Sequence, residues 1–282
     1  MRSLAEHQRY LFKFYYIGSK KYYGSQRQNK VWTIERCIFE ALKNTNYIQN
    51  FKTSGFEVAS RTDKLVSARG ASFSFLTEKE PILMEINSQL PKEIGLWAYT
   101  RVANEFSSRF NAILRHYKYF FPLNFQISQE LNIDLVNQAC RILEGHHDFK
   151  NFAKREKNNI TTIRTLEVAT TNLQDNYIIF EFKSKSYLRQ QIRRMVAKLI
   201  EVGTGILSKE NFLKLFDPSS NISYQPANPV GLILWDIIYE ENVKFEVDSK
   251  SVNRMMNYFS LEEQKFNRKR ILFHILQHDN IS

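Results

Sequence analysis

The stretch Gly70-Ala-Ser-Phe-Ser-Phe-Leu76 decides the fold. Its small and aromatic residues alternate with two serines, which predicts a strand with one apolar and one polar face. Strands are also expected on either side, from Arg9 to Ile17 and from Leu96 to Val102. Thr33 can cap a helix that runs to about Asn44, and Pro81 opens a second, shorter helix. Residues 1–108 therefore predict the order strand, helix, strand, helix, strand.

The second half of the chain repeats this rhythm. Its expected strands are Tyr117–Phe121, Arg164–Thr171, Tyr177–Lys183 and Gly231–Tyr239, and its expected helices are Ile133–Leu143 and Ser186 to about Val202. Two α+β halves of similar plan, residues 1–108 and 109–241, predict a duplicated ferredoxin-like (RRM-like) arrangement. Residues 242–282 are charged and amphipathic, and they predict a helical C-terminal extension packed on the body or on a partner.

The charge of the chain favours a polyanionic partner. Lysine and arginine number 40 and aspartate and glutamate 29, so the formal net charge is +11, and the pI is about 9.5. Nucleic acid is the leading partner for such a surface, and an anionic membrane is the second. No membrane span is expected, because the longest apolar run, Leu232 to Tyr239, contains Asp236 and falls short of the roughly 20 residues required. Lys13 interrupts the apolar stretch near the N-terminus, so no signal peptide is expected.

Cysteine and histidine usage indicates a reduced protein without a metal. Cys37 and Cys140 lie far apart inside helical patterns, which predicts free thiols in a reducing compartment, the cytoplasm. His274 and His278 share an i, i+4 helix face, but no third ligand stands near them in the pattern. The chain has no glycine-rich phosphate loop, nucleophile elbow or Cys-x-x-Cys, and no cofactor is expected.

The stretch Ala59-Ser-Arg-Thr-Asp-Lys64 sets a carboxylate among basic residues. Asp63 follows Arg61 by two positions and precedes Lys64 directly. In a basic protein this pattern fits a reactive acid placed where a polyanion is held. A loop ion cluster is the simpler interpretation of such a pattern taken alone.

The expected helix after Ser186 supplies candidate partners for that acid. Arg189 and Arg193 border its apolar stripe, and a border arginine can reach a carboxylate at the edge of a core. Arg194 and Lys198 point away from the stripe, as a solvated basic face would.

A second basic and aromatic cluster runs from Arg109-Phe110 to Arg115-His116-Tyr117-Lys118-Tyr119. Aromatic residues between cations commonly stack bases and hold phosphates, although they are also ordinary strand residues. His146-His147-Asp148 could form an acid–base pair, but a hydrogen-bonded loop is the simpler interpretation.

Taken together, the motifs resemble the TruA-type tRNA pseudouridine synthases from about Tyr15 to Tyr239. Arg61-Thr62-Asp63 matches the signature of that family. The other matching segments, in order, are Tyr22-Tyr23-Gly24, Gln26-Arg27-Gln28-Asn29, Thr33-Ile34-Glu35, Arg109-Phe110-Asn111-Ala112, Tyr117-Lys118-Tyr119, Gly145-His146-His147-Asp148-Phe149 with Phe152, Leu188 with Gln191-Ile192-Arg193-Arg194-Met195-Val196, and Pro229 with Gly231-Leu232-Ile233-Leu234. Many members have glycine where Leu65 stands.

The resemblance implies two domains that share an antiparallel sheet with a basic cleft between them. It implies isomerisation of uridine to pseudouridine in the tRNA anticodon stem-loop, without metal or cofactor, and it leaves a homodimer open. Asp63 would be the catalytic aspartate, Arg193 its ion-pair partner, and Tyr117 the tyrosine that packs against the base. Substrate contacts are expected at Arg61, Tyr117, Arg193, Leu234, Arg109 and Arg27.

The chemistry of the reaction agrees with those roles. The C1′–N1 bond breaks and a C1′–C5 bond forms, so the base must detach and turn in one pocket. A carboxylate can add to the base or sugar, or it can remove a sugar proton. A uridine in a duplex is out of reach, so base flipping is expected, and Arg61 can compensate the distorted backbone.

Two rival functions remain open at this stage. A non-catalytic RNA-binding protein would keep the basic surface but would not need the acid. A membrane-surface or protein-interaction module built on the C-terminal extension would expose apolar side chains in residues 250–278.

Overall fold

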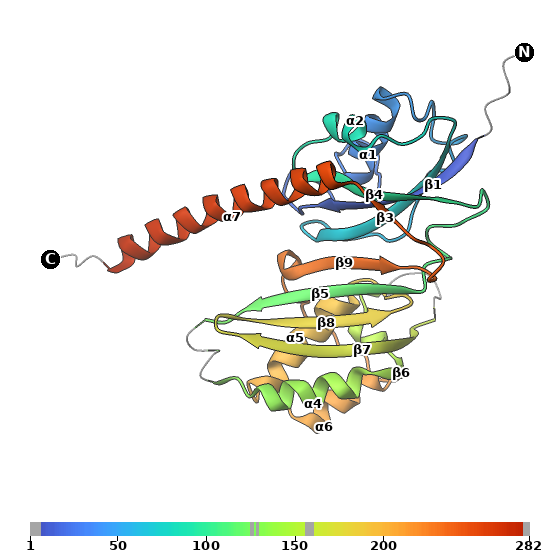
Figure 1. Ribbon diagram of the computed structural model, residues 1–282. Coiled ribbons are helices and arrows are strands. Elements are labelled where there is room, and N and C mark those ends of the chain that lie inside the picture. The colour runs from blue at the N-terminus through green and yellow to red at the C-terminus, as the bar shows by residue number, and fades with distance from the viewer. Residues whose placement is uncertain (1–6, 125–126, 128–129, 156–160, 279–282) are drawn as a thin grey trace, which may run out of the picture.

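The computed structural model describes residues 7–124, 127, 130–155 and 161–278. Its centre is a large sheet with strand order β10-β4-β1-β3-β9-β5-β8-β7-β6, and β2 pairs with β3 outside this path (Figure 1). The strands are β1 (Gln8–Tyr16), β2 (Glu57–Val58), β3 (Ser67–Thr77), β4 (Ile94–Val102), β5 (Leu114–Pro122), β6 (Gly145–Asp148), β7 (Ile163–Gln174), β8 (Tyr177–Ser184), β9 (Leu232–Ile238) and β10 (Glu246–Val247). The predicted α+β class, with a mostly antiparallel sheet, is confirmed.

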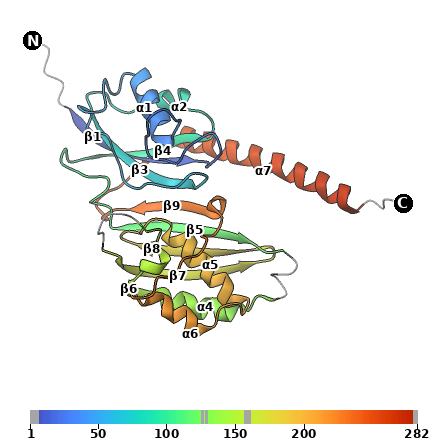
Figure 2. The same ribbon diagram turned by 180° about the vertical axis from the view of Figure 1, so that it is seen from behind.

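Helices are packed against this sheet (Figures 1 and 2). They are α1 (Ile34–Asn44), α2 (Leu83–Ser88), α4 (Ile133–Leu143), α5 (Gln191–Gly203), α6 (Lys209–Leu213) and α7 (Ser249–His278). The predicted cap of α1 is confirmed, because the Thr33 hydroxyl accepts a hydrogen bond from the Arg36 amide at 3.3 Å. The predicted helix Ile133–Leu143 is α4 itself.

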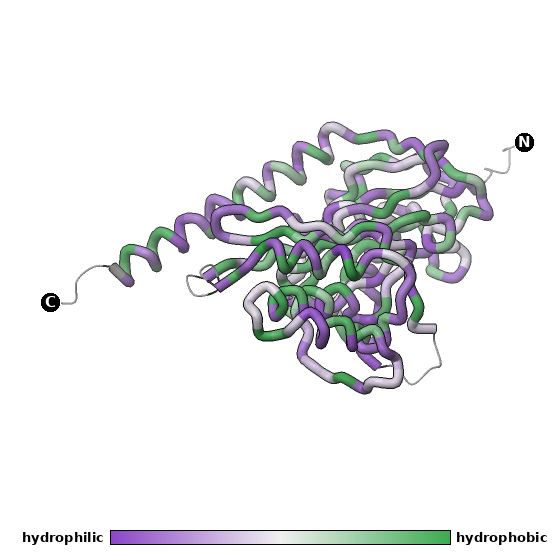
Figure 3. The backbone as a smooth tube through the Cα atoms, turned by 90° about the horizontal axis from the view of Figure 1, so that it is seen from below, coloured by the Kyte–Doolittle hydropathy of each residue, from purple (hydrophilic) through white to green (hydrophobic). Residues whose placement is uncertain are grey.

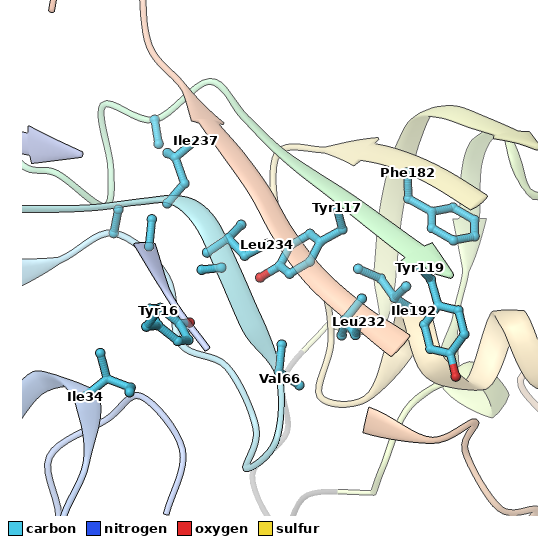
Figure 4. Packing of buried hydrophobic residues seen from close by; sticks show 14 of the residues in the cluster. Tyr16, Ile34, Val66, Tyr117, Tyr119, Phe182, Ile192, Leu232, Leu234 and Ile237 are labelled. Carbon is cyan, nitrogen blue, oxygen red and sulfur yellow. The ribbon is translucent and has the colours of Figure 1, made fainter. Parts of the chain in front are cut away.

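One face of the sheet, here called the front face, carries the main apolar core. Phe12 of β1 stacks on Phe73 of β3 with ring centroids 5.1 Å apart, as the alternation around Gly70 predicts. The same buried cluster includes residues of α1, α4 and α5. Strand parity places Tyr117 and Leu234 on this face, beside each other in Figure 4.

The opposite, back face is partly covered as well. Ser72 and Ser74 are buried, although serines on a polar strand face are commonly exposed. Tyr239 lies on this side, and its hydroxyl donates a hydrogen bond to the Ser108 carbonyl at 2.7 Å. The segment after β9 therefore closes the back of β1 and β3.

Strands β3 and β9 meet at a parallel seam in an otherwise antiparallel set of pairs among the described strands. Its register joins Ser67 to Ile233 and Ala68 to Leu234. A Cβ on Gly70 would lie 2.8 Å from the Trp235 carbonyl oxygen, so the close approach of the strands requires glycine there. On one side of the seam the strand order is β4-β1-β3-β2, and on the other it is β9-β5-β8-β7.

The prediction of a helix from Ser186 was wrong at its start. Helix α5 begins at Gln191, because Gln190 takes a left-handed conformation with φ 61° and ends any helix that would come before it. Arg189 therefore lies before the helix. Arg194 and Lys198 are not a solvated face either: both are half-buried, and both lie over the Tyr224 ring, at 5.1 and 4.2 Å.

The prediction for residues 242–282 was partly wrong. The segment first forms the short strand β10, and helix α7 then packs on β1 and β4 only at its beginning, where Met255 is buried. Beyond Leu261 the helix leaves the body (Figure 1), and large apolar side chains are exposed there. Hydrophobic and hydrophilic residues follow one another along this part of the tube in Figure 3. No helix in the described part of the chain has the length and apolar character needed to cross a membrane.

Candidate active site

Asp63 lies in the loop between β2 and β3. The loop is fixed by a second loop, residues 18–33, in which the Ser25 hydroxyl accepts a hydrogen bond from the Thr62 amide at 2.7 Å. The Thr62 hydroxyl shares a 2.7 Å hydrogen bond with the Tyr16 hydroxyl of β1. Gly24, at φ 85°, allows the loops to touch, because its Cβ would lie 3.0 Å from the Thr62 carbonyl oxygen. The residue before Asp63 is therefore fixed by the loop 18–33 through its amide and by β1 through its hydroxyl.

Arg193 of α5 meets Asp63 across the seam. Its Nη1 lies 3.2 Å from Asp63 Oδ2, and the side chains are 10% and 36% exposed. Arg193 Nε donates to the Ala227 carbonyl at 2.7 Å, so the guanidinium is anchored on its other edge. A shielded, oriented arginine therefore holds the Asp63 side chain in a position that solvent still reaches.

Tyr117 of β5 forms the third side of this site. Its ring is buried and packs edge-on against Tyr187 with centroids 5.3 Å apart, and its hydroxyl shares a 3.2 Å hydrogen bond with Ser60. Burial raises the pKa of Tyr117, so its hydroxyl stays neutral. Leu234 is fully buried beside it, in register with both Tyr117 and Ala68. The structure therefore brings Asp63, Arg193, Tyr117 and Leu234 together at the seam.

The three remaining predicted arginines lie at the surface. Arg61 is exposed two residues before Asp63. Arg109 is exposed, and its backbone amide donates to Glu57 Oε2 at 3.3 Å, which keeps it near the start of the same loop. The guanidinium of Arg27 lies 3.7 Å from the centre of the Phe51 ring, so it is held on the α1 side of the molecule and not against Asp63.

The basic and aromatic cluster of β5 is divided by the sheet. Arg115 is buried, and its guanidinium donates to the carbonyls of Ala59 and Arg109 at 3.1 and 2.6 Å. Arg115 therefore supports the loop that carries Asp63, and its guanidinium is engaged by the protein itself. The burial of Arg115 follows from strand parity, because residues 115, 117 and 119 of β5 share the front face of the sheet.

His116 and Lys118 project from the opposite face of β5. Lys118 Nζ lies 2.8 Å from Glu181, and His116 Nε2 lies 3.0 Å from the same carboxylate. Burial lowers the pKa of His116. Neither side chain belongs to the site around Asp63.

Leu65 has a left-handed backbone conformation, with φ 72°. The turn that contains it is closed by a 3.3 Å hydrogen bond from the Val66 amide to the Asp63 carbonyl. A branched residue in this conformation costs roughly 1 kcal/mol or more, whereas glycine adopts it freely. The departure at Leu65 is thus a position where backbone geometry, and not chemistry, favours glycine.

The other candidate groups do not form sites. His146 bonds to the Thr165 hydroxyl at 3.1 Å and His147 to the Glu144 carbonyl at 2.7 Å, so this segment is hydrogen-bonded as predicted. The predicted loop was wrong, because the segment is strand β6, paired with β7. Within the described residues, no three His, Cys, Asp or Glu side chains are grouped to hold a metal, and the side chain of His278 lies outside that part. Cys37 and Cys140 are free, and burial raises their pKa values to about 11 and about 12.

The arrangement defines a class of protein. An aspartate held by a shielded arginine, beside an aromatic ring and inside a basic protein, is suited to work on a nucleotide. The family model of the tRNA pseudouridine synthases matches residues 139–240 of the chain.

Comparison of whole chains identifies the family. A tRNA pseudouridine synthase A of Methanosarcina acetivorans is 33% identical over 269 residues, which cover 94% of each chain. That of Pyrococcus furiosus is 34% identical over 87% of this chain and 89% of its own. That of Methanosarcina mazei is 29% identical over 95% and 97%. The chain belongs to the TruA-type family of tRNA pseudouridine synthases.

Proposed function

We propose that this enzyme isomerises uridine to pseudouridine in the anticodon stem-loop of tRNA, with Asp63 as the catalytic carboxylate. The observation that carries the proposal is the ion pair between Asp63 Oδ2 and Arg193 Nη1 beside Tyr117. A purely structural ion pair would not need its aspartate in a loop, whereas Asp63 stands outside any strand, between β2 and β3. The substrate class is supported by the tRNA pseudouridine synthases that the chain is similar to.

In the proposed mechanism the target uridine flips out of the stack and enters the space at the seam. Arg61 and Arg109 hold the backbone phosphates, Tyr117 packs against the base, and Leu234 supports Tyr117 from the core. Asp63 then either attacks C1′ and displaces uracil as its N1 anion, or removes the proton at C2′ so that the C1′–N1 bond breaks and uracil leaves as the same anion. In both routes the base turns and C5 bonds to C1′, which releases the carboxylate in the first route and returns the proton to C2′ in the second. The proton on C5 is then lost and N1 gains one, so the product is an isomer of the substrate.

A basic cleft between two ferredoxin-like halves is part of this proposal. The strand orders β4-β1-β3-β2 and β9-β5-β8-β7 have the same plan on the two sides of the seam, which supports a duplicated fold. We take residues 1–108 as the half that carries Asp63 and residues 109–241 as the half that carries Arg193. Residues 242–282 form the C-terminal extension.

Two further parts of the proposal concern the cell and the assembly. A tRNA substrate and thiols without a disulfide are consistent with the cytoplasm. We also propose that the enzyme is a homodimer, which is supported by the apolar residues that α7 leaves exposed.

The decisive experiment maps pseudouridine in unmodified tRNA after incubation with the purified enzyme. We expect new pseudouridine confined to the anticodon arm, formed without added metal or cofactor. Tight tRNA binding with no pseudouridine would favour the non-catalytic RNA-binding alternative. Uridine deuterated at C2′ separates the two chemical routes, because only proton removal is slowed by deuterium there.

A further inference from the structure

The loop before α1 exposes two aromatic side chains close to Asp63. Tyr23 and Trp32 are 51% and 53% exposed. Tyr23 directly precedes Gly24, the residue at which this loop touches the loop of Asp63. A single exposed ring is ordinary on a protein surface. Two exposed rings beside the candidate active site can contact its substrate.

The backbone holds both residues in place. The Tyr23 amide donates a hydrogen bond to the Trp32 carbonyl at 2.8 Å, so the two residues are joined across the loop. The Ser25 amide donates to the Thr62 carbonyl at 3.2 Å, which joins this loop to the residue before Asp63. A surface that is ordered in advance loses less entropy when it binds a ligand. Tyr23 and Trp32 are therefore fixed relative to Asp63 before any RNA arrives.

Each of the two rings has a cation at one face. Lys64 Nζ lies 3.8 Å from the centre of the Tyr23 ring, and the guanidinium carbon of Arg36 lies 4.7 Å from the centre of the Trp32 ring. Lys64 follows Asp63 directly, and Arg36 belongs to the first turn of α1. A cation over a ring is attracted by the ring electrons, and it can also meet a phosphate. The two pairs therefore combine a flat apolar surface with positive charge.

The ligand that suits this surface is an unpaired nucleotide of RNA. Residues 18–36 include five basic residues and one acidic residue, Glu35, which is buried, so the charge that the loop exposes is positive. Bases stacked inside a duplex offer no free face to a side chain, whereas unstacked bases of a loop can stack on aromatic rings. An acidic protein would match the charge alone. RNA matches both the charge and the rings.

We propose that Tyr23 and Trp32 form a stacking platform for unpaired bases that lie next to the target uridine. This inference rests on the proposed function, because it places the uridine at Asp63 and its neighbours on the platform. Lys64 and Arg36 hold the phosphates of the stacked nucleotides. Every base has a face that can stack, so the platform selects unpaired RNA beside the target and not a particular base. This side of the enzyme thus recognises an open loop rather than a sequence.

The first test measures the affinity of the full-length enzyme for a fluorescent, unmodified anticodon stem-loop RNA by anisotropy. Tyr23→Ala and Trp32→Ala should each weaken binding at least about fivefold, because each removes one ring on which a base stacks. The slope of log affinity against log salt should not change, since no charge is lost. Tyr23→Phe and Trp32→Phe keep a ring and should bind as the wild type does.

Tyr177→Ala is the matched control for this test. Tyr177 is 41% exposed in β8, outside the loop before α1, so its removal should leave the affinity unchanged. Wild-type affinity in either alanine variant of the platform would overturn the proposal. So would an equal loss in the alanine and phenylalanine variants, because it would mean that the rings act on the fold of the loop and not by stacking.

The second test locates the stacked bases with RNAs that carry a single abasic nucleotide at successive positions near the target uridine. At one position, loss of the base should weaken binding by the wild type at least about fivefold and leave binding by Trp32→Ala unchanged. If every abasic RNA weakens the wild type and both alanine variants equally, stacking on these rings is wrong. Both tests read affinity and not turnover. An enzyme that forms pseudouridine while its alanine variants bind normally would lose the platform and keep the proposed function.

Discussion

Two aspartate–cation pairs cross the seam, one on each face of the sheet. On the front, Asp63 and Arg193 have side chains 36% and 10% exposed. On the back, Asp236 and Lys13 are 41% and 5% exposed. In both pairs a shielded cation meets a half-exposed carboxylate, so charge and burial do not distinguish the candidate active site from its counterpart.

The surroundings of the two pairs do distinguish them. Asp236 stands in β9, where its Oδ1 also accepts the Ile237 amide at 2.9 Å, and Lys13 lies 5.7 and 5.0 Å from the ring centres of Tyr239 and Phe245. Asp63 stands in a loop, outside any strand, next to the hydroxyl-bearing edge of a buried tyrosine. An ion pair built into a strand holds the sheet together. One built into a loop leaves its carboxylate open to a substrate.

The largest expected effect separates the two aspartates by activity. Asp63→Asn should lower pseudouridine formation at least about 10³-fold, because the amide can neither attack nor take a proton. Its affinity for tRNA should stay nearly unchanged in a filter-binding assay. Asp236→Asn is the matched control and should retain turnover. Continued modification by the Asp63 variant would remove that residue from the catalytic role.

The next effect separates the same aspartates by stability. Asp236→Ala leaves the buried Lys13 ammonium without its carboxylate partner, and we expect a loss of about 2–4 kcal/mol in the free energy of unfolding. Each cation keeps one bond to a backbone carbonyl, Lys13 to Ile237 and Arg193 to Ala227. Asp63→Ala should cost less, because a delocalised guanidinium is more weakly hydrated than an ammonium and loses less when it stays buried without its carboxylate. Urea denaturation of both variants measures the difference. Equal losses would mean that the back pair is no more structural than the front pair.

A binding experiment asks whether the front face alone contacts RNA. Arg109→Ala should weaken tRNA binding several-fold and lower the slope of log affinity against log salt by about one. Lys118→Ala, on the back face, should leave that slope unchanged. A loss of slope in the second variant would place RNA on both faces.

The pH dependence of stability sharpens the description of the back pair. Burial lowers the pKa of Lys13, with Asp236 opposing the effect, so the folded protein releases this proton at lower pH than the unfolded chain. Its contribution to stability is complete above the ordinary lysine pKa and is lost as pH falls through the lower folded value. Relative to Lys13→Met, the wild type should therefore gain stability as pH rises through that window. Thermal melts of both proteins across alkaline pH measure this. If the difference in stability between them does not change with pH, the lowered pKa of Lys13 is wrong.

The smallest effect concerns the loop itself. Leu65→Gly removes the strain of φ 72° but also frees the unfolded chain, so the free energy of unfolding should change by less than about 1 kcal/mol. Val66→Gly is the control. Because Val66 is buried, this substitution should lower the free energy of unfolding by more. A large destabilisation by Leu65→Gly would show that the leucine side chain packs in the folded loop.

Much of this fold was predictable because its strands alternate and its helices are capped. The alternation of Ala71, Phe73 and Phe75 with serines predicts β3, and Thr33 as a capping residue predicts the start of α1. The start of α5 was not predictable, because the left-handed turn at Gln190 depends on the contacts around it and not on glycine or proline. For α7 the sequence left open whether the body or a partner covers its apolar residues, since the pattern is the same in both cases.

The candidate site was predictable from motifs but not from physics alone. The pairing of Asp63 with Arg193 joins segments 130 residues apart, which no local pattern encodes. The buried role of Arg115 could have been inferred from its parity with Tyr117. The exact position of Arg27 over Phe51 could not, because it depends on where the loop before α1 lies.

The parallel register of β3 and β9 also has a consequence for how the enzyme is made. Ser67 pairs with Ile233, so the ribosome must synthesise most of the chain before this contact can form. Closing so long a stretch of chain is slow relative to local contacts, and β1, α1 and β3 can fold before it. We expect a nascent chain to display Asp63 on its loop well before Arg193 reaches it. The two segments of the candidate site would then meet only near the end of folding.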